Sequence, residues 1–318
     1  MRVLVLTAAQ RLPNLSTLYS ALEQQVELDV RTLEKPQQCD LRRTLRDIDW
    51  ADYQRVLLDL PFKNIYQQAR YLRQLNGLLI YEEDACQNYL SSSRWHGAFS
   101  RLYRQLPSAR VLVTGAHVAA RLQAEGFDVR FAAKGYDQQT LRLQHLERDI
   151  ELGFVGRTAS AAYKGRKHLL DQLSACEPLQ LLRAEPGEAY CNLLNRIRYF
   201  VSADVGLGEY MAKNFEAMAC GCVLLAWHQG GEEAAIGLED GHHLLLYRNL
   251  PELLGHIADL REDGARAQRI ADAGRAFVES NLSYVNLSKR FAEVLAEPWP
   301  CNQPLTGWRT FLQRLRLF

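Results

Sequence analysis

Gly206–Gly221 reads GLGEYMAKNFEAMACG, and the apolar run CVLLAW follows it at 222–227. The apolar residues 199–201 precede Gly206. The pattern therefore predicts a buried strand, a loop that contains glycines, a short helix and a second buried strand. Gly221 suits the helix end, because glycine adopts the left-handed conformation without a Cβ clash. A loop entering a helix N-terminus presents backbone N–H groups and the helix dipole. We therefore expect an anion site here, with Glu216 accepting hydrogen bonds from vicinal hydroxyls of a nucleotide diphosphate.

Strand and helix patterns alternate on both sides of this stretch, which predicts an α/β fold of parallel sheets covered by helices. The predicted strands are 3–6, 26–30, 55–60, 78–81, 110–114, 129–131, 152–156, 179–182, 199–201, 222–227 and 243–247. Residues 65–75 and 85–106 are predicted to be helical. The polar stretch 138–149 is typical of an interdomain connection. We predict one domain over 1–138, a second over 139–297 and a terminal segment over 298–318.

Composition excludes several classes of protein. The 318 residues carry a net charge of +1, which argues against a bulk nucleic-acid binder. Seven scattered cysteines do not form a disulfide framework, and no pattern of His, Cys or Asp predicts a metal site. No apolar run reaches the ~18 residues needed to span a bilayer, and the opening MRVLVLTAAQ reads as a strand. We expect a cytoplasmic protein.

The phosphate-binding candidates are cationic and lie after predicted strands. The first predicted strand leads into TAAQRLPN, which has no GxGxxG or Walker pattern, so a dinucleotide or ATP site is unsupported. By contrast, four cations within eleven residues surround the loop and helix start after the strand 152–156. Because cations at a helix N-terminus are electrostatically unfavourable alone, an anionic partner is favoured over a solvated basic helix start. The candidates are Arg157, Lys164 and Arg166.

Two further features leave alternatives open. Glu82, Glu83 and Asp84 follow a predicted strand, and they fit either a solvated helix start or carboxylates that line a cleft and orient an acceptor hydroxyl. The tail, 298–318, interleaves arginines with apolar residues. It fits a helix that packs back on the first domain, or a basic amphipathic segment that contacts the inner face of a membrane.

The C-terminal half resembles the GT-B glycosyltransferases. It is most similar to the branch called CgeB-like or glycosyltransferase-1-like, and more distantly to the retaining family 4 enzymes. The matched stretches are FVGR at 154–157, ADVGLGEYMAKNFEAMACGCVLLAW at 203–227, DGHHLLLYRNLPEL at 240–253 and RIADAGRAFVESNLSY at 269–284.

This resemblance implies two Rossmann-like domains facing across a cleft, with a C-terminal helix crossing back to the first. It implies that the C-terminal domain holds a nucleotide-diphosphate sugar and that transfer retains the anomeric configuration. We expect the acceptor to be a cell-surface glycan, glycolipid or protein. We expect no metal or other cofactor, because fixed cations and helix N–H groups can stabilise the departing diphosphate. A non-catalytic module that binds a nucleotide or a partner is the alternative, because Gly208 stands where the family has its first glutamate.

Site residues follow from the same resemblance. Glu216 would bind the ribose hydroxyls, and Glu209, one residue from the expected position, would serve the sugar. Arg157 with Lys164 or Arg166 would neutralise the diphosphate, and Lys213 and Asn214 would contact phosphate. The predicted catalytic residues are Glu209, from the resemblance, and Glu82 and Asp84, from the interpretation of the acidic run as carboxylates that line the cleft.

Overall fold

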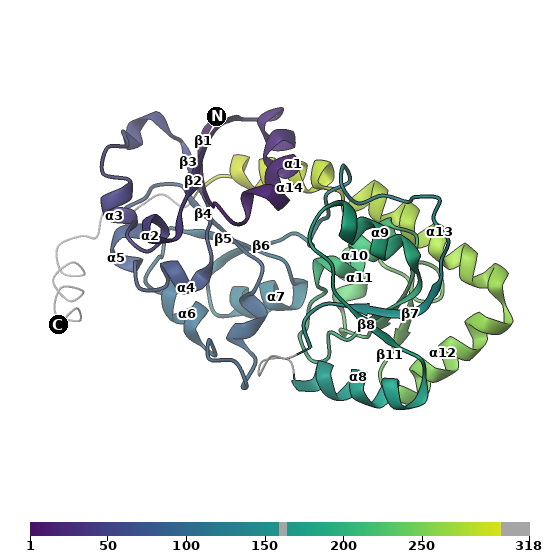
Figure 1. Cartoon of the computed structure of the whole chain (residues 1–318). Helices are drawn as coiled ribbons and strands as arrows, with labels where there is room; N and C mark the ends of the chain where they lie inside the picture. The colour runs from purple at the N-terminus through teal and green to yellow at the C-terminus, as the bar shows by residue number, and fades with distance from the viewer. Residues whose placement is uncertain (159–163, 300–318) are drawn as a thin grey trace.

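The computed structural model describes residues 1–158 and 164–299, which form two parallel β-sheets covered by helices (Figure 1). The N-terminal sheet has the strand order β2-β1-β3-β4-β5-β6, and the C-terminal sheet has the order β11-β10-β9-β7-β8. Every pairing within the two sheets is parallel. The predicted fold class, two α/β units with parallel sheets, is confirmed.

The N-terminal sheet is buried on both faces, as near-continuous apolar strands require. Leu4 and Leu6 belong to the apolar cluster that contains Phe62 and Phe99. Val3 and Val5 belong to the cluster on the other face, which contains Leu18 and Phe291. Its strands are β1 (Arg2–Ala8), β2 (Glu27–Leu33), β3 (Arg55–Asp59), β4 (Leu78–Glu82), β5 (Arg110–Val113) and β6 (Asp128–Phe131).

The helices of this half are mostly short. They are α1 (Leu12–Glu23), α2 (Lys35–Gln38), α3 (Leu41–Thr44), η1 (Trp50–Asp52), α4 (Phe62–Ile65), α5 (Ala69–Leu72), η2 (Ala85–Asn88), α6 (Ala98–Tyr103) and α7 (Ala116–Ala124). The predicted helices over 65–75 and 85–106 are wrong in extent. The second is interrupted before α6, where Gly97 has a left-handed φ of 67° that does not continue a helix.

The C-terminal half has longer helices around a smaller sheet. Its strands are β7 (Ile150–Val155), β8 (Gln180–Leu182), β9 (Ile197–Ser202), β10 (Val223–Trp227) and β11 (Leu245–Tyr247). Its helices are α8 (Lys164–Cys176), α9 (Glu188–Arg196), α10 (Ala212–Ala219), α11 (Glu232–Ile236), α12 (Leu250–Glu262), α13 (Gly264–Asn281) and α14 (Tyr284–Ala296).

The chain crosses between the halves twice, and the two crossings lie against each other. The Tyr136 N–H donates to the Leu282 carbonyl at 3.1 Å, and the Tyr284 N–H donates to the Tyr136 carbonyl at 3.0 Å. Gly135 is needed there because a Cβ would lie 2.9 Å from the Leu282 oxygen. The second crossing leads into α14, which packs on α1.

The returning helix begins earlier than the sequence analysis placed it. Phe291, Val294 and Leu295 of α14 share a core cluster with β1, although 139–297 was predicted to be one domain. We therefore propose that residues 284–299 belong to the N-terminal unit. Of the terminal segment 298–318, the structure describes Pro298 and Trp299, and Trp299 packs against the core of the N-terminal half. The predicted packing and membrane contact of 300–318 lie outside the described residues.

Within 1–158 and 164–299, no helix combines the length and the apolar character needed to cross a membrane.

Candidate active site

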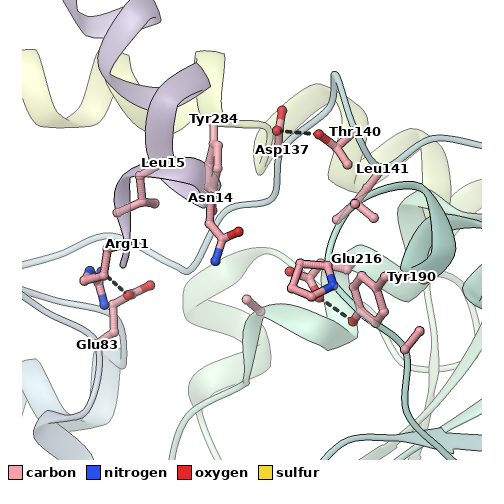
Figure 2. A pocket seen from close by; sticks show the side chains of 14 residues that line it. Arg11, Asn14, Leu15, Glu83, Asp137, Thr140, Leu141, Tyr190, Glu216 and Tyr284 are labelled. Carbon is pink, nitrogen blue, oxygen red and sulfur yellow. Dashed lines mark hydrogen bonds and ion pairs between the residues drawn. The ribbon is translucent and has the colours of Figure 1, made fainter. Parts of the chain in front are cut away.

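A cavity of about 530 Å³ opens between the two halves, near the carboxyl ends of both sheets. From the N-terminal half it is lined by Arg11, Asn14 and Glu83, and from the C-terminal half by Tyr190 and Glu216. Figure 2 shows the Arg11–Glu83 pair on one wall and the Tyr190–Glu216 pair on the opposite wall. This is the position at which parallel α/β sheets bind ligands.

Glu216 lies where the sequence predicted, in the second turn of α10 and facing the cavity. The Tyr190 hydroxyl donates to Glu216 Oε2 at 2.6 Å, which fixes the carboxylate. Burial raises the pKa of Glu216, while Tyr190 and Lys213 oppose this rise. A fixed carboxylate with a second oxygen that accepts hydrogen bonds suits a pair of hydroxyl groups.

The loop before α10 is held by Asp204, a fully buried carboxylate that sequence analysis did not single out. Its Oδ2 accepts hydrogen bonds from Asn214 Nδ2 at 2.8 Å and from the Met211 N–H at 3.2 Å, and its Oδ1 pairs with Arg166 Nη2 at 2.7 Å. Although burial opposes the charge, Lys213 and Arg166 hold the pKa of Asp204 below its usual value. One carboxylate thus fixes both the loop and the start of the helix.

Two of the predicted phosphate ligands are therefore bound to protein. Arg166 is buried, with its guanidinium against Asp204 and the Ala203 carbonyl. Asn214 is fully buried and donates to the same carboxylate. The structure does not place either side chain in the cavity wall, so we reassign both from phosphate binding to positioning of the loop.

Lys213 lies in the first turn of α10 and is partly exposed, although it is not among the described residues that line the 530 Å³ cavity. Its Nζ lies 4.3 Å from the centre of the Phe154 ring, and a Cβ on Gly156 would come within 2.9 Å of it. The glycine of the FVGR stretch therefore makes room for the ammonium group. Burial lowers the pKa of Lys213 to about 8. The negative charges of Asp204 and Glu216 oppose this decrease, and the positive charge of Arg166 adds to it.

Arg157 and Lys164 flank residues 159–163, which lie outside the described part of the chain. Both side chains are exposed: Arg157 follows β7 and Lys164 begins α8. Neither lines the 530 Å³ cavity among the described residues. Their phosphate-binding role stays a prediction.

Glu209 forms an ion pair that links the two halves. Lys134, just after β6, places Nζ 3.1 Å from Glu209 Oε1, and Thr114 Oγ1 donates to Oε2 at 3.4 Å. Burial raises the pKa of Glu209, although Lys134 opposes the rise. Sequence analysis missed Lys134, and the available signal was a lysine at the carboxyl end of a buried strand.

The acidic run 82–84 divides between three environments. Glu82 is buried at the end of β4, and burial raises its pKa to about 8, so it is protonated at neutral pH. Asp84 is exposed and donates its backbone N–H to Glu82 Oε1. Glu83 lines the cavity instead, because neighbouring residues at a strand end face opposite ways. The predicted catalytic pair, Glu82 and Asp84, is therefore replaced by Glu83 as the cleft carboxylate.

Arg11 anchors the wall that Glu83 occupies. Its guanidinium pairs with Glu83 and, through Nε, with Asp59 Oδ1 at 2.8 Å. Asp59 also accepts from Tyr19 and Thr7. Burial raises the pKa of Asp59 to about 6, against the effect of Arg11. Arg11 was missed because a lone arginine after a strand has no distinctive pattern.

No group of three or more His, Cys, Asp or Glu side chains in the described residues is arranged to hold a metal ion. The expectation that no metal or other cofactor takes part stays a prediction.

A family model described as glycosyl transferase-like matches residues 98–295, more than half of the chain and including the cavity residues of the C-terminal half. The chain belongs to this glycosyltransferase family. No curated protein matches it in sequence.

Solved structures agree on the GT-B fold of this glycosyltransferase. Anabaena HepE, in complex with UDP and glucose, is 14% identical with a TM-score of 0.70, over 94% of this chain and 100% of that one. Sucrose-phosphate synthase of Thermosynechococcus elongatus is 14% identical with a TM-score of 0.68, over 92% and 98%. Phage T4 BGT, in complex with its UDP-glucose substrate, is 10% identical with a TM-score of 0.57, over 93% and 100%.

These comparisons establish a glycosyltransferase of the GT-B fold, as the sequence resemblance implied. Assignment to the CgeB-like branch, or to a relationship with the retaining family 4 enzymes, stays a prediction.

The buried Asp204–Arg166 pair yields a stability prediction. Asp204→Asn leaves the Arg166 guanidinium buried without its counter-charge, which should lower the free energy of unfolding by about 3–5 kcal/mol. Asp171→Asn is the matched control, because Asp171 pairs with Lys167 at an exposed site and should cost less than ~0.5 kcal/mol. Urea denaturation measures both, and equal small losses would show that Asp204 does not hold the loop.

Proposed function

We propose that this glycosyltransferase transfers a sugar from a UDP-sugar to a cell-surface glycan, glycolipid or protein acceptor. The observation that supports this most is Glu216, fixed by Tyr190 on one wall of a cavity between two Rossmann-like halves. The choice of UDP rests on HepE, solved with UDP and glucose, and on BGT, solved with UDP-glucose. We further propose a cytoplasmic location.

The donor would occupy the C-terminal wall. We propose that Glu216 binds the ribose hydroxyls and that Lys213, at the start of α10, faces the diphosphate. Met211, the N-cap residue of α10, provides no side-chain cap of its own and donates its N–H to Asp204. We propose that the N–H groups of Ala212 and Lys213, which follow it, and the helix dipole face the anion. Arg157 and Lys164 would add charge from the loop after β7.

The chemistry requires stabilisation of a departing diphosphate. Cleavage of the bond between the anomeric carbon and the phosphate oxygen leaves negative charge on UDP, and fixed cations with oriented N–H groups lower the energy of that state. We propose that Lys213 and the 157–164 cations supply this charge without a metal ion. Retention of configuration is proposed from the resemblance to retaining enzymes.

The acceptor would approach from the N-terminal wall. Glu83 is held in the cavity by Arg11, and Arg11 and Lys134 keep the pKa of Glu83 below its usual value despite burial. An ionised carboxylate at this position can accept a hydrogen bond from an acceptor hydroxyl. We propose that Glu83 orients the acceptor and that Glu209, paired with Lys134, positions the donor sugar.

Turnover and binding together test the proposed function. The protein should release UDP from at least one UDP-sugar, slowly with water and faster with its acceptor. Glu216→Ala should weaken UDP binding roughly 10- to 100-fold, because it removes charge-assisted hydrogen bonds, whereas the exposed Glu262→Ala should bind normally. UDP binding by calorimetry without release from any UDP-sugar would instead indicate a binding module, and unchanged affinity in Glu216→Ala would refute the assigned site.

The pKa of Lys213 gives a pH dependence. Below pH 8 the ammonium group is charged and available to phosphate, and above pH 8 it loses its proton in the free enzyme. UDP affinity should therefore fall as pH rises through 8, by up to roughly tenfold per pH unit. Lys213→Arg stays charged, so its affinity should stay flat over this range. Calorimetry measures both profiles, and the same fall in both proteins would remove Lys213 from the donor site.

A further inference from the structure

The outer face of the N-terminal half concentrates positive charge. Residues 61–76 and 88–123 contain no Asp or Glu, although the whole chain is nearly neutral. The cations in these two segments are Lys63, Arg70, Arg73, Arg94, Arg101, Arg104, Arg110 and Arg121. Arg110 is buried and paired with Asp128, and Arg104 is paired with Glu125, so the imbalance comes from the other six cations, which are exposed. Such an imbalance within a chain of net charge +1 indicates a surface for an anionic partner.

The two segments fold against each other and form a shallow hollow of about 580 Å³. The Phe62 and Phe99 rings stack with centres 3.8 Å apart beneath it. Tyr66, Trp95 and three arginines line the hollow. In Figure 1, α4, α5 and α6 lie farther from the C-terminal half than α7 does, and the hollow shares no lining residue with the 530 Å³ cavity. The hollow is therefore separate from the 530 Å³ cavity of the donor site.

We call Arg70, Arg94 and Arg101, with Tyr66 and Trp95, the basic face. All three arginines are exposed, and none forms an ion pair with any residue in 1–158 or 164–299. Arg104, one turn after Arg101, is by contrast paired with Glu125 at 2.8 Å. The cations of the basic face thus repel one another without a counter-charge from the described chain.

The aromatic residues distinguish between anionic partners. Trp95 is half-buried, with the Arg94 guanidinium 4.6 Å above its ring and the Phe62 and Tyr66 rings packed edge-on at 5.2 and 5.0 Å. A ring covered in this way does not offer a free surface for stacking a nucleotide base. Partly exposed Trp and Tyr among arginines match the lipid headgroup region, where amphipathic rings and long cationic side chains are favoured.

The described chain ends against the N-terminal half, beside the start of β5. Trp299 donates from Nε1 to the Ser108 carbonyl at 3.0 Å, and its ring lies 4.2 Å from the Arg110 guanidinium. The residues that follow, 300–318, contain three arginines and no acid. Their composition cannot neutralise the basic face, and it suits the same anionic surface.

We propose that the basic face docks the N-terminal half of this enzyme onto an anionic lipid bilayer. The contact is electrostatic, and Trp95 and Tyr66 lie at the level of the headgroups. The proposal is independent of the donor site and of the sugar transferred, because it requires neither the C-terminal half nor turnover.

The test is co-sedimentation of the full-length protein with lipid vesicles, without nucleotide sugar. The parent protein should bind vesicles in which phosphatidylglycerol replaces part of the phosphatidylcholine, should not bind phosphatidylcholine alone, and should dissociate as salt is raised. The variant R70E/R94E/R101E should bind roughly a hundredfold more weakly, because each Lys or Arg near such a surface contributes about a factor of five.

A matched variant controls for net charge. R198E/R248E/R269E makes the same change at exposed arginines of the C-terminal half and should bind like the parent protein. Thermal denaturation establishes whether each variant is folded. If R70E/R94E/R101E does not fold, R70Q/R94Q/R101Q takes its place, and this neutral variant should also bind anionic vesicles more weakly than the parent protein.

Three results would overturn the proposal. The first is equal binding of the parent and the basic-face variant to anionic vesicles. The second is a loss confined to R309E/R314E/R316E, which would place the contact in the tail. The third is salt-sensitive binding of duplex DNA through the basic face with no binding to anionic vesicles, which would identify a nucleic-acid surface.

Discussion

The carboxylate of Asp204 is the constraint on which the donor wall depends. It is fully buried, and its charge is matched by Arg166 and Lys213 and satisfied by the Asn214 amide and the Met211 N–H. An uncompensated charge in this position would cost several kcal/mol, so the loop has one low-energy arrangement. That arrangement fixes the first turn of α10. It thereby sets the direction of the Glu216 side chain, which lies one turn further along the helix and lines the cavity.

Charged contacts also bring the two halves together around the cavity. Lys134 pairs with Glu209 across the interface, and Glu232 at the start of α11 accepts hydrogen bonds from the first two N–H groups of α7, at 2.8 and 3.0 Å. The second contact satisfies helix N–H groups that would otherwise lack partners. Specific polar pairs among the described residues thus join the two halves beside the cavity.

Local pattern was enough to predict the sheets and the loop, but not the partners within the site. Buried parallel strands produce apolar runs, so the positions of β1 and β10 could be read directly from sequence. Arg11, Lys134 and Asp204 could not, because their roles depend on which distant segments face each other after folding. The same holds for Arg166. Its position beside a strand-to-helix loop predicted that it binds phosphate, whereas in the folded chain it pairs with the buried carboxylate of Asp204.

The most direct test of the donor site is a crystal structure of the enzyme soaked with UDP. We expect nucleotide density in the cavity between the halves, with the ribose hydroxyls within hydrogen-bonding distance of Glu216 and the diphosphate facing Lys213 at the start of α10. A nucleotide bound elsewhere, such as the smaller pocket lined by His117 and Trp227, with the Tyr190–Glu216 wall empty, would contradict it.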